Sequence, residues 1–300
     1  MCANNLEISF LKNLAPKRRS WSIVARKKIT AGFIGRHLLL FGFLLFTTYP
    51  LLWMTLTALR TEGDAQQRPL GLPAQWTLDN LREVFASSNF LQAWQNSLLL
   101  CVVAVALAIA AAALAAWAFA QFRFRGCNVL FVLFLLGMMI PVHVTLIPLN
   151  QLLGADMLNL KGGLGALIGP YAGFALPVSI LILRRAFEAI PQELLDAGAL
   201  DGCSQWQAFW HIGLPLARPA LSTVLIFNFL SMWNEYAFAL TLLGPGCQTV
   251  PLALTEFKGE HDLRITTVCA ALLLVLIPLI LVYLFAQKQI IRGLTAGSIK

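Results

Sequence analysis

The chain has 300 residues, of which 58% are hydrophobic and only 12% are charged. Soluble domains are about half apolar and about a quarter charged, so this composition excludes an ordinary soluble protein and favours a lipid bilayer as the solvent. The net charge of +8 would suit nucleic acid, but the basic residues follow a membrane pattern, described below, and we expect no nucleic-acid partner.

Long uncharged stretches recur along the whole chain. Five of them contain no charged residue, and a sixth contains only Glu235. Each stretch can hold the roughly 20 apolar residues that cross a hydrocarbon core. The sequence therefore predicts an all-α, polytopic membrane protein of about six transmembrane helices. The predicted spans are residues 38–58, 95–119, 128–150, 164–183, 220–243 and 265–286.

The basic residues predict the orientation of these spans. With the N-terminus inside, the inner segments hold 16 of the 22 basic residues and the outer segments hold 6. This asymmetry follows the positive-inside rule. We expect a multi-pass protein of the cell inner membrane with both termini in the cytoplasm. Residues 1–36 would form a basic tail attracted to the membrane lipid, without a cleavable signal peptide, and residues 37–300 the transmembrane domain.

Small and kink-forming residues mark the second and third spans. Alanine recurs every four residues in span two, which predicts a smooth helix face that another helix can approach closely. The strip consists of Ala104, Ala108, Ala112, Ala116 and Ala120. In span three, Pro141 and Pro148 remove backbone hydrogen bonds and permit kinks.

The predicted cytoplasmic stretch between spans four and five is not loop-like. Pro191 and the residues after it predict a helix to Leu200, with Gly202 as its left-handed cap. Ser204 and Gln207 have capping-box spacing and predict a second short helix, which Ile212, Leu214 and Pro215 end. We call residues 191–215 the two-helix segment. Its three large aromatic side chains either dock on a partner or pack on the protein's own helices and the membrane face; they are Trp206, Phe209 and Trp210.

The two-helix segment resembles the cytoplasmic loop of the permease subunits of ATP-binding-cassette (ABC) importers. That loop carries Glu-Ala-Ala, three residues, Gly, nine residues, Ile, one residue and Leu-Pro; here the stretch reads DAGALDGCSQWQAFWHIGLP. Asp196, Ala197 and Gly198 stand in place of Glu-Ala-Ala. Asp shortens the reach of the carboxylate, and Gly in place of Ala lowers helix propensity by about 1 kcal/mol. Gly202, Ile212, Leu214 and Pro215 fall at the family spacing.

The resemblance extends over residues 35–300. Asn96-Ser97-Leu98, which open span two, and Trp233-Asn234-Glu235-Tyr236 late in span five look like the family. The tail around Arg292–Gly297 is similar to the carbohydrate branch, specifically to the smaller of the two maltose permease subunits. The resemblance implies a permease domain over residues 37–300, which forms the pathway for a sugar.

The resemblance also implies partners and roles. The chain would pair with a second, different permease subunit, cytosolic ATP-binding subunits and an extracytoplasmic solute-binding protein. It lacks the phosphate-loop motif, so we expect no cofactor, no enzymatic activity and ATP bound only by partners. We expect no metal site, because no metal-ligand spacing occurs. The coupling residues would be Glu193, Asp196, Ala197, Gly198, Gly202, Ile212, Leu214 and Pro215.

Glu235 is a charge within a predicted span, which is costly and often functional. Two interpretations stay open: Asn234 and Glu235 line the translocation pathway, or they hydrogen-bond between helices. The alternative function is an ion-coupled secondary transporter. That class needs buried ionisable residues in several spans and often inverted repeats, whereas five spans here have no charge.

Overall fold

A computed structural model describes residues 31–155, 157–256 and 264–296. Within these residues the backbone is helical or irregular, and the single isolated β-bridge joins Gly162 to Leu243. This confirms the predicted all-α class. The predicted basic tail lies almost wholly outside the described residues, and helix α2 (Ala31–Ala58) begins inside the boundary predicted for that tail.

The chain divides into two compact units at Pro50, which lies inside α2. In the unit before this proline, the described part is a single apolar helix with exposed leucine and phenylalanine side chains. The unit of residues 51–300 contains all the other helices. It carries the sites discussed below.

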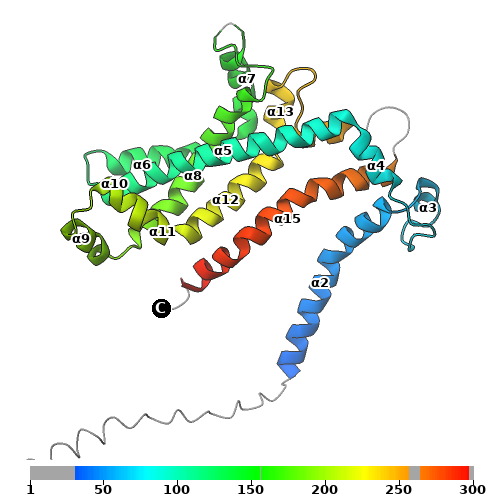
Figure 1. Ribbon diagram of the computed structural model, residues 1–300, viewed down its shortest axis with the longest axis horizontal. Coiled ribbons are helices and arrows are strands. Elements are labelled where there is room, and N and C mark those ends of the chain that lie inside the picture. The colour runs from blue at the N-terminus through cyan, green and yellow to red at the C-terminus, as the bar shows by residue number, and fades with distance from the viewer. Residues whose placement is uncertain (1–30, 156, 257–263, 297–300) are drawn as a thin grey trace, which may run out of the picture. The chain divides into compact units, whose positions relative to one another are not determined.

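Four long helices form the bundle of this second unit: α5 (Ser88–Gln121), α8 (Gly165–Glu188), α12 (Arg218–Trp233) and α15 (Ile265–Ala296). They run side by side (Figure 1). Four of the five alanines in the predicted strip of α5 are buried: Ala104, Ala108, Ala112 and Ala116 are 0% exposed, while Ala120 is half-buried. Small side chains there let α5 pack closely along α8.

In the described residues, four helices are long and apolar enough to cross a membrane, and the number rises to six if each of two bent pairs forms one span. The first bent pair corrects the prediction for span three, residues 128–150. Helix α6 (Cys127–Leu136) and the 3₁₀ turn η1 (Gly137–Met139) precede Pro141, and α7 (Val142–Leu153) leaves at 100°. Proline favours an extended residue before it, and Ile140 has φ −79° and ψ 113°. The predicted kink is therefore a complete break.

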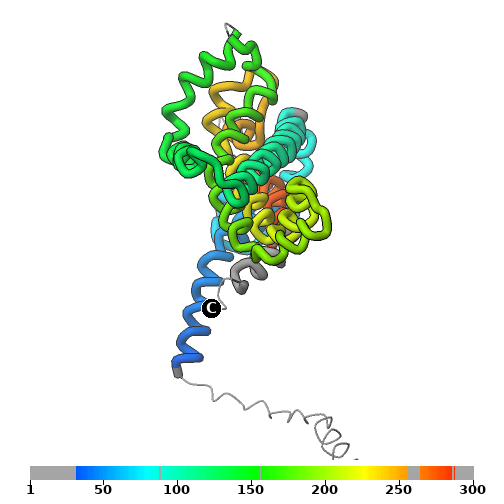
Figure 2. The backbone as a smooth tube through the Cα atoms, turned by 90° about the vertical axis from the view of Figure 1, so that its left-hand side faces the viewer, coloured from blue at the N-terminus to red at the C-terminus, as the bar shows by residue number. Residues whose placement is uncertain are grey.

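The prediction for span five, residues 220–243, is also wrong in detail. Helix α12 stops at Trp233, and the short helix α13 (Ala237–Leu242) begins after an irregular Asn234–Tyr236 turn. Helices α7 and α13 lie together in both views (Figures 1 and 2). The amide of Gly162 donates to the carbonyl of Leu242 at 2.9 Å, and the amide of Gly244 donates to Gly162 at 3.1 Å. The connection between α7 and α8 is thus hydrogen-bonded to the end of α13.

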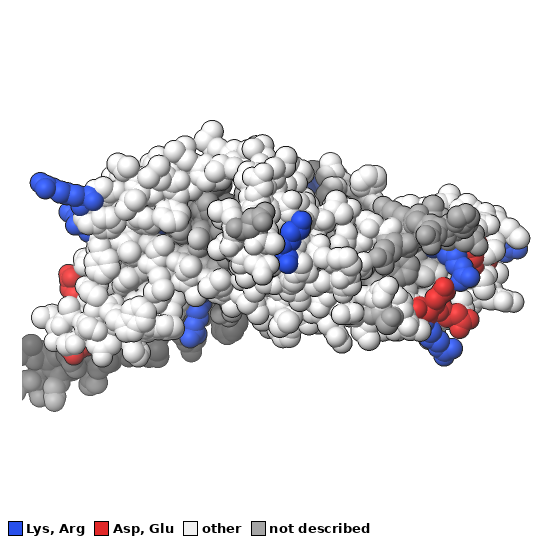
Figure 3. Space-filling model, turned by 90° about the horizontal axis from the view of Figure 1, so that it is seen from above, with Lys and Arg blue, Asp and Glu red and all other residues white. Residues whose placement is uncertain are grey.

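The short helices gather at the two ends of the bundle (Figure 1). One end holds α3 (Glu62–Gln67) and α4 (Asp79–Ala86); we call residues 59–86 the cap segment. The opposite end holds α9 (Gln192–Leu200), α10 (Gln205–Ala208), the π-helix η2 (Phe209–Gly213) and α11 (Leu214–Leu216). Helix α14 (Val250–Glu256) contacts α5 and α15. Seen from above, most charged side chains lie at these two ends, and few lie on the surface between them (Figure 3).

Candidate functional site

The first half of the two-helix segment matches its prediction. Helix α9 covers Gln192–Leu200, and Gly202 follows it with φ +85°. The amide of Cys203 donates to the carbonyl of Gly198 at 2.9 Å, and the amide of Gly202 donates to Ala199 at 3.0 Å. These two bonds form a Schellman motif, which satisfies the carbonyl groups at the end of the helix and fixes the bend. The predicted left-handed cap is confirmed.

The second half begins with the predicted capping box. The backbone amide of Ser204 donates to Gln207 Oε1 at 2.8 Å, and the amide of Gln207 donates to Ser204 Oγ at 3.3 Å. The chain stays helical through η2 to Leu216, one residue beyond the predicted end at Ile212, Leu214 and Pro215. Pro215 has no amide hydrogen for the carbonyl of His211, and the chain widens to π geometry before it instead of stopping.

Gly198 and Ile212 bring the two short helices together. Gly198 is buried, and a Cβ atom added to it would lie 2.8 Å from Ile212 Cδ1. The structure thus places three of the predicted coupling residues, Gly198, Gly202 and Ile212, at the crossing and its bend. Leu214 and Pro215 are half-buried where the chain returns into the bundle.

The remaining predicted coupling residues lie on the surface of α9. Glu193, Asp196 and Ala197 are exposed, and Asp196 Oδ1 accepts a hydrogen bond from Gln192 Nε2 at 3.0 Å. Both carboxylates are therefore accessible to a cation on another molecule. No ion pair involving either of them occurs in the described part of the chain.

The sequence left open whether the aromatic side chains of the segment dock on a partner or pack on the protein itself, and the structure differs from one side chain to the next. Phe209 is 2% exposed and packs edge-on against Trp117 of α5, with the ring centroids 5.7 Å apart. Trp206 and Trp210 remain 58% and 51% exposed. Phe209 is therefore the anchor to the protein's own bundle, while the two tryptophans leave an apolar surface for contact.

Sequence reasoning missed the role of Gly213. A Cβ atom at this position would lie 2.6 Å from Trp117 Cζ3, so only glycine lets η2 approach the ring. Trp117 in turn packs edge-on against Phe187 of α8 at 5.2 Å. One indole ring thus connects the two-helix segment to both long helices.

The turn between α12 and α13 is organised by Glu235. Its Oε1 accepts from the amide of Phe238 at 2.7 Å, and its Oε2 accepts from the amide of Ala239 at 3.2 Å. Tyr171 of α8 donates its hydroxyl to Oε2 at 2.9 Å. Glu235 thus satisfies free amides at the start of α13 and joins that helix to α8. Asn234 is not its partner, as one interpretation had it, because Asn234 Nδ2 donates to the carbonyl of Leu230 at 2.8 Å.

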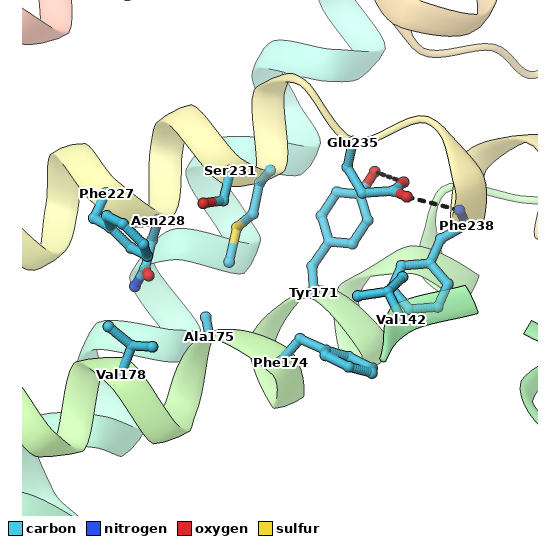
Figure 4. Close-up of a pocket in the computed structure, with 11 residues that line it drawn as sticks. Val142, Tyr171, Phe174, Ala175, Val178, Phe227, Asn228, Ser231, Glu235 and Phe238 are labelled. Atoms are coloured by element: carbon cyan, nitrogen blue, oxygen red, sulfur yellow. Dashed lines mark hydrogen bonds between the residues drawn. The ribbon is translucent and has the colours of Figure 1, made fainter. Parts of the chain in front are cut away.

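Glu235 also lines a cavity of about 170 Å³ between α8 and α12 (Figure 4). Its polar lining consists of Tyr171, Asn228, Ser231 and Glu235. Asn228 Nδ2 donates to Ser179 Oγ at 3.0 Å, which is a buried polar contact between α12 and α8. The apolar lining consists of Val142, Phe174, Ala175, Val178, Phe227, Met232 and Phe238.

Of the two predicted pathway residues, the structure places Glu235 in the cavity and leaves Asn234 outside its lining. Tyr171, Asn228 and Ser231 were missed, because single uncharged polar residues in apolar spans give a weak signal. Asn228, Ser231 and Glu235 do follow helical spacing, and this was the available clue. Within the described residues, no group of three or more His, Cys, Asp or Glu side chains is placed to hold a metal ion.

The bent segment at one end of an apolar bundle and the polar-lined cavity within it define a membrane transport subunit. Residues 104–296 match the family described as "Binding-protein-dependent transport system inner membrane component". The chain belongs to this family and is a permease of the ABC importer class.

Two curated relatives support this assignment. One is the ABC transporter permease protein ORF2 of Caldicellulosiruptor sp. (strain Rt8B.4), to which the chain is 37% identical over 258 residues. The aligned region covers 85% of this chain and 93% of ORF2. The chain is 32% identical to the diacetylchitobiose uptake system permease DasC of Streptomyces coelicolor, covering 84% of this chain and 91% of that one.

A solved structure supports the fold. A chain of a bacterial ABC transporter involved in the import of the acidic polysaccharide alginate superposes with a TM-score of 0.74 at 24% identity. The superposition covers 85% of this chain and 95% of the other. At this identity the likeness shows the fold alone.

Proposed function

We propose that this permease subunit forms half of the membrane pathway of a carbohydrate importer. The support comes from two relatives, which are named as permeases for diacetylchitobiose uptake and for arabinooligosaccharide transport. A second, different permease would supply the other half, and an extracytoplasmic binding protein would deliver the sugar. A structural neighbour is a transporter complexed with a periplasmic protein that carries an alginate pentasaccharide.

The observation that carries the proposal is the construction of the two-helix segment. Its inner side is fixed to the bundle through Phe209 and Gly213, which pack against Trp117 of α5, while its outer side stays exposed. Leu194 and Leu200 are 47% and 89% exposed beside the two acidic residues of α9. A surface that combines apolar and acidic side chains suits docking onto a separate protein with matching cations.

We infer that this separate protein is a cytosolic ATPase. Closure of an ATPase dimer would move α9 and α10, and Phe209 would pass the movement to Trp117 and Phe187. Leu214 and Pro215 lead directly into α12, which lines the cavity. The pathway would then shift between inward-open and outward-open populations that nucleotide and binding protein favour differently.

The same proposal orients the chain. The two-helix segment and both termini would lie in the cytoplasm, and the cap segment outside. The permease domain would occupy residues 37–300, and residues 1–36 would remain a basic tail at the membrane surface. The chain would need no cofactor, because its partners would bind ATP.

The test is co-purification with the ATPase subunits, followed by ATP-dependent sugar uptake in proteoliposomes. We expect Gly202→Pro to abolish uptake while the subunit still inserts, because proline cannot adopt a positive φ. Gly246→Pro is a matched control, since Gly246 also has a positive φ, +77°, but lies outside the segment. This control should retain the ATPase subunits.

Two results would contradict the proposal. One is wild-type uptake by Gly202→Pro, which would remove the segment from coupling. The other is uptake that proceeds without ATP and follows an ion gradient, which would favour the secondary transporter.

A further inference from the structure

The cavity between α8 and α12 is lined by one charged side chain, and that charge is negative. Among its described lining residues, Glu235 is the only ionisable carboxylate, and there is neither lysine nor arginine. In the sequence, no other charged residue occurs between Arg218 and Glu256, and none occurs between Lys161 and Arg184. At 1.5 Å per residue, Arg218 lies about 26 Å along the chain from Glu235, and Arg184 about 20 Å from Tyr171. Neither of these two helix cations is among the residues that line the cavity.

The carboxylate is also held in place. Three donors fix it at 2.7, 2.9 and 3.2 Å, two from the α13 backbone and one from Tyr171. Both oxygens are engaged, so the group cannot rotate away from a ligand without losing these bonds (Figure 4). A fixed charge among largely apolar side chains acts on other charges more strongly than it would in bulk water, because the local dielectric constant is lower.

The rest of the lining suits a neutral polar ligand. Asn228 and Ser231 offer an amide and a hydroxyl, which exchange hydrogen bonds with sugar hydroxyl groups. Phe174, Phe227 and Phe238 supply apolar faces for the C–H surfaces of a sugar ring. An acidic sugar would meet the same surfaces, but its anion would be desolvated without a cation and repelled by Glu235.

Building on the proposed function, we propose that the pathway in this chain admits uncharged sugars and rejects acidic ones, with Glu235 as the specificity-determining residue. His143 is exposed and follows Val142 of the lining in the chain, but it is not itself among the lining residues.

The experiment measures weak binding directly on the assembled membrane complex in nanodiscs, without the binding protein, by saturation-transfer NMR. The probes are N,N′-diacetylchitobiose as the neutral sugar and digalacturonate as the acidic one. We expect digalacturonate to bind at least about tenfold more weakly to the wild type, which corresponds to about 1.4 kcal/mol. Glu235→Gln should bring the two affinities to within about threefold, since it keeps an acceptor for the α13 amides and removes the charge.

Two control variants separate charge from structure. Asp79→Asn removes an exposed carboxylate of the cap segment and should change nothing. His143→Gln should also leave the discrimination unchanged.

Equal affinities in the wild type, or discrimination that survives Glu235→Gln, would overturn the charge selection. Failure of both sugars to bind the wild type would overturn it as well. In each case, ATP-dependent uptake measured with the binding protein decides independently whether the proposed function stands.

Discussion

The two-helix segment and the cap segment are both short helical structures at opposite ends of one bundle, but different forces hold them. Apolar contacts fix the two-helix segment: Ile212 against Gly198, Phe209 against Trp117, and Gly213 beneath the same indole ring. Its acidic residues on α9 take no part in these contacts and stay exposed.

Charged and polar side chains hold the cap segment. Arg60 is 0% exposed, and its Nη1 donates to the carbonyl of Arg68 at 2.8 Å. Asn80 Nδ2 donates to the carbonyls of both Ala58 and Arg60 at 2.8 Å. Glu62 accepts from the amide and hydroxyl of Thr266 at 3.1 and 2.7 Å, which caps the start of α15. Glu83 pairs with Arg264 at 3.0 Å.

The difference supports the proposal that the two-helix segment, and not the cap segment, docks on a partner. In the cap segment, Arg60 and Glu62 form hydrogen bonds with backbone groups at helix ends. These charged side chains are therefore engaged within the chain itself. In the two-helix segment the backbone is satisfied locally by the Schellman motif and the capping box. Its charges and two tryptophans are left available, as a docking element requires.

The sharpest test of this contrast is Arg60→Ala. We expect it to lower the free energy of unfolding by about 3 kcal/mol, because buried acceptors lose their donor and a cavity opens. Those acceptors are Arg68 O, Leu56 O and Thr57 Oγ1. Denaturation in mixed detergent micelles measures the change.

Arg82→Ala is the matched control, since the Arg82–Asp79 pair is 78% exposed on both sides and such pairs contribute little. An Arg60→Ala protein as stable as this control would show that the cap segment is not held by its buried charge.

Two glycines of the two-helix segment provide the second test. Gly213→Ala should cost about 1–3 kcal/mol, because the Trp117 ring is wedged between Phe187 and Phe209 and cannot yield. Gly198→Ala should be nearly neutral, since Ile212 Cδ1 is the end of a flexible side chain and alanine gains about 1 kcal/mol of helix propensity. The free energy of unfolding of both variants is measured in the same micelles. Equal losses of stability would show that packing against Trp117 is not the main interaction that fixes the two-helix segment.

Local rules made the helices of the two-helix segment predictable. The spacing around Gly202, Ser204 and Gln207 specifies hydrogen bonds between residues close in the chain, and the structure contains those bonds. The alanine strip of α5 was predictable for the same reason, because its pattern repeats within one helix. The coupling roles of these residues remain predictions.

Features that depend on distant partners were not predictable. Pro141 indicated a kink, but its 100° break depends on how α7 packs with α13 and the Gly162 bridge. Glu235 looked like a buried charge of uncertain purpose, because its partner Tyr171 lies 64 residues earlier in the chain. Gly213 carried no sequence signal, since the ring that requires it belongs to another helix.

The smallest expected effect is a pH dependence confined to the cap segment. Burial alone would raise the pKa of Glu62, but hydrogen bonds from Thr266, Gln66 and Ile265 outweigh it and hold the pKa below the ordinary 4.5. The folded state therefore favours the carboxylate. Its contribution to stability is present above the ordinary value and is lost as the pH falls through the lowered one. Arg60, Arg264 and Glu83 are the charged groups near this site.

Unfolding measured from about pH 6 to about pH 3 should show this loss, and Glu62→Gln should flatten part of the slope. Glu83→Gln is the matched control: its pair with Arg264 is half-exposed and screened by water, so the slope should hardly change. An unchanged slope in Glu62→Gln would mean that the cap of α15 does not depend on a charge. Neutral hydrogen bonds and Arg60 would then stabilise the cap segment. The buried guanidinium of Arg60 would be the one charged group that distinguishes its packing from that of the two-helix segment.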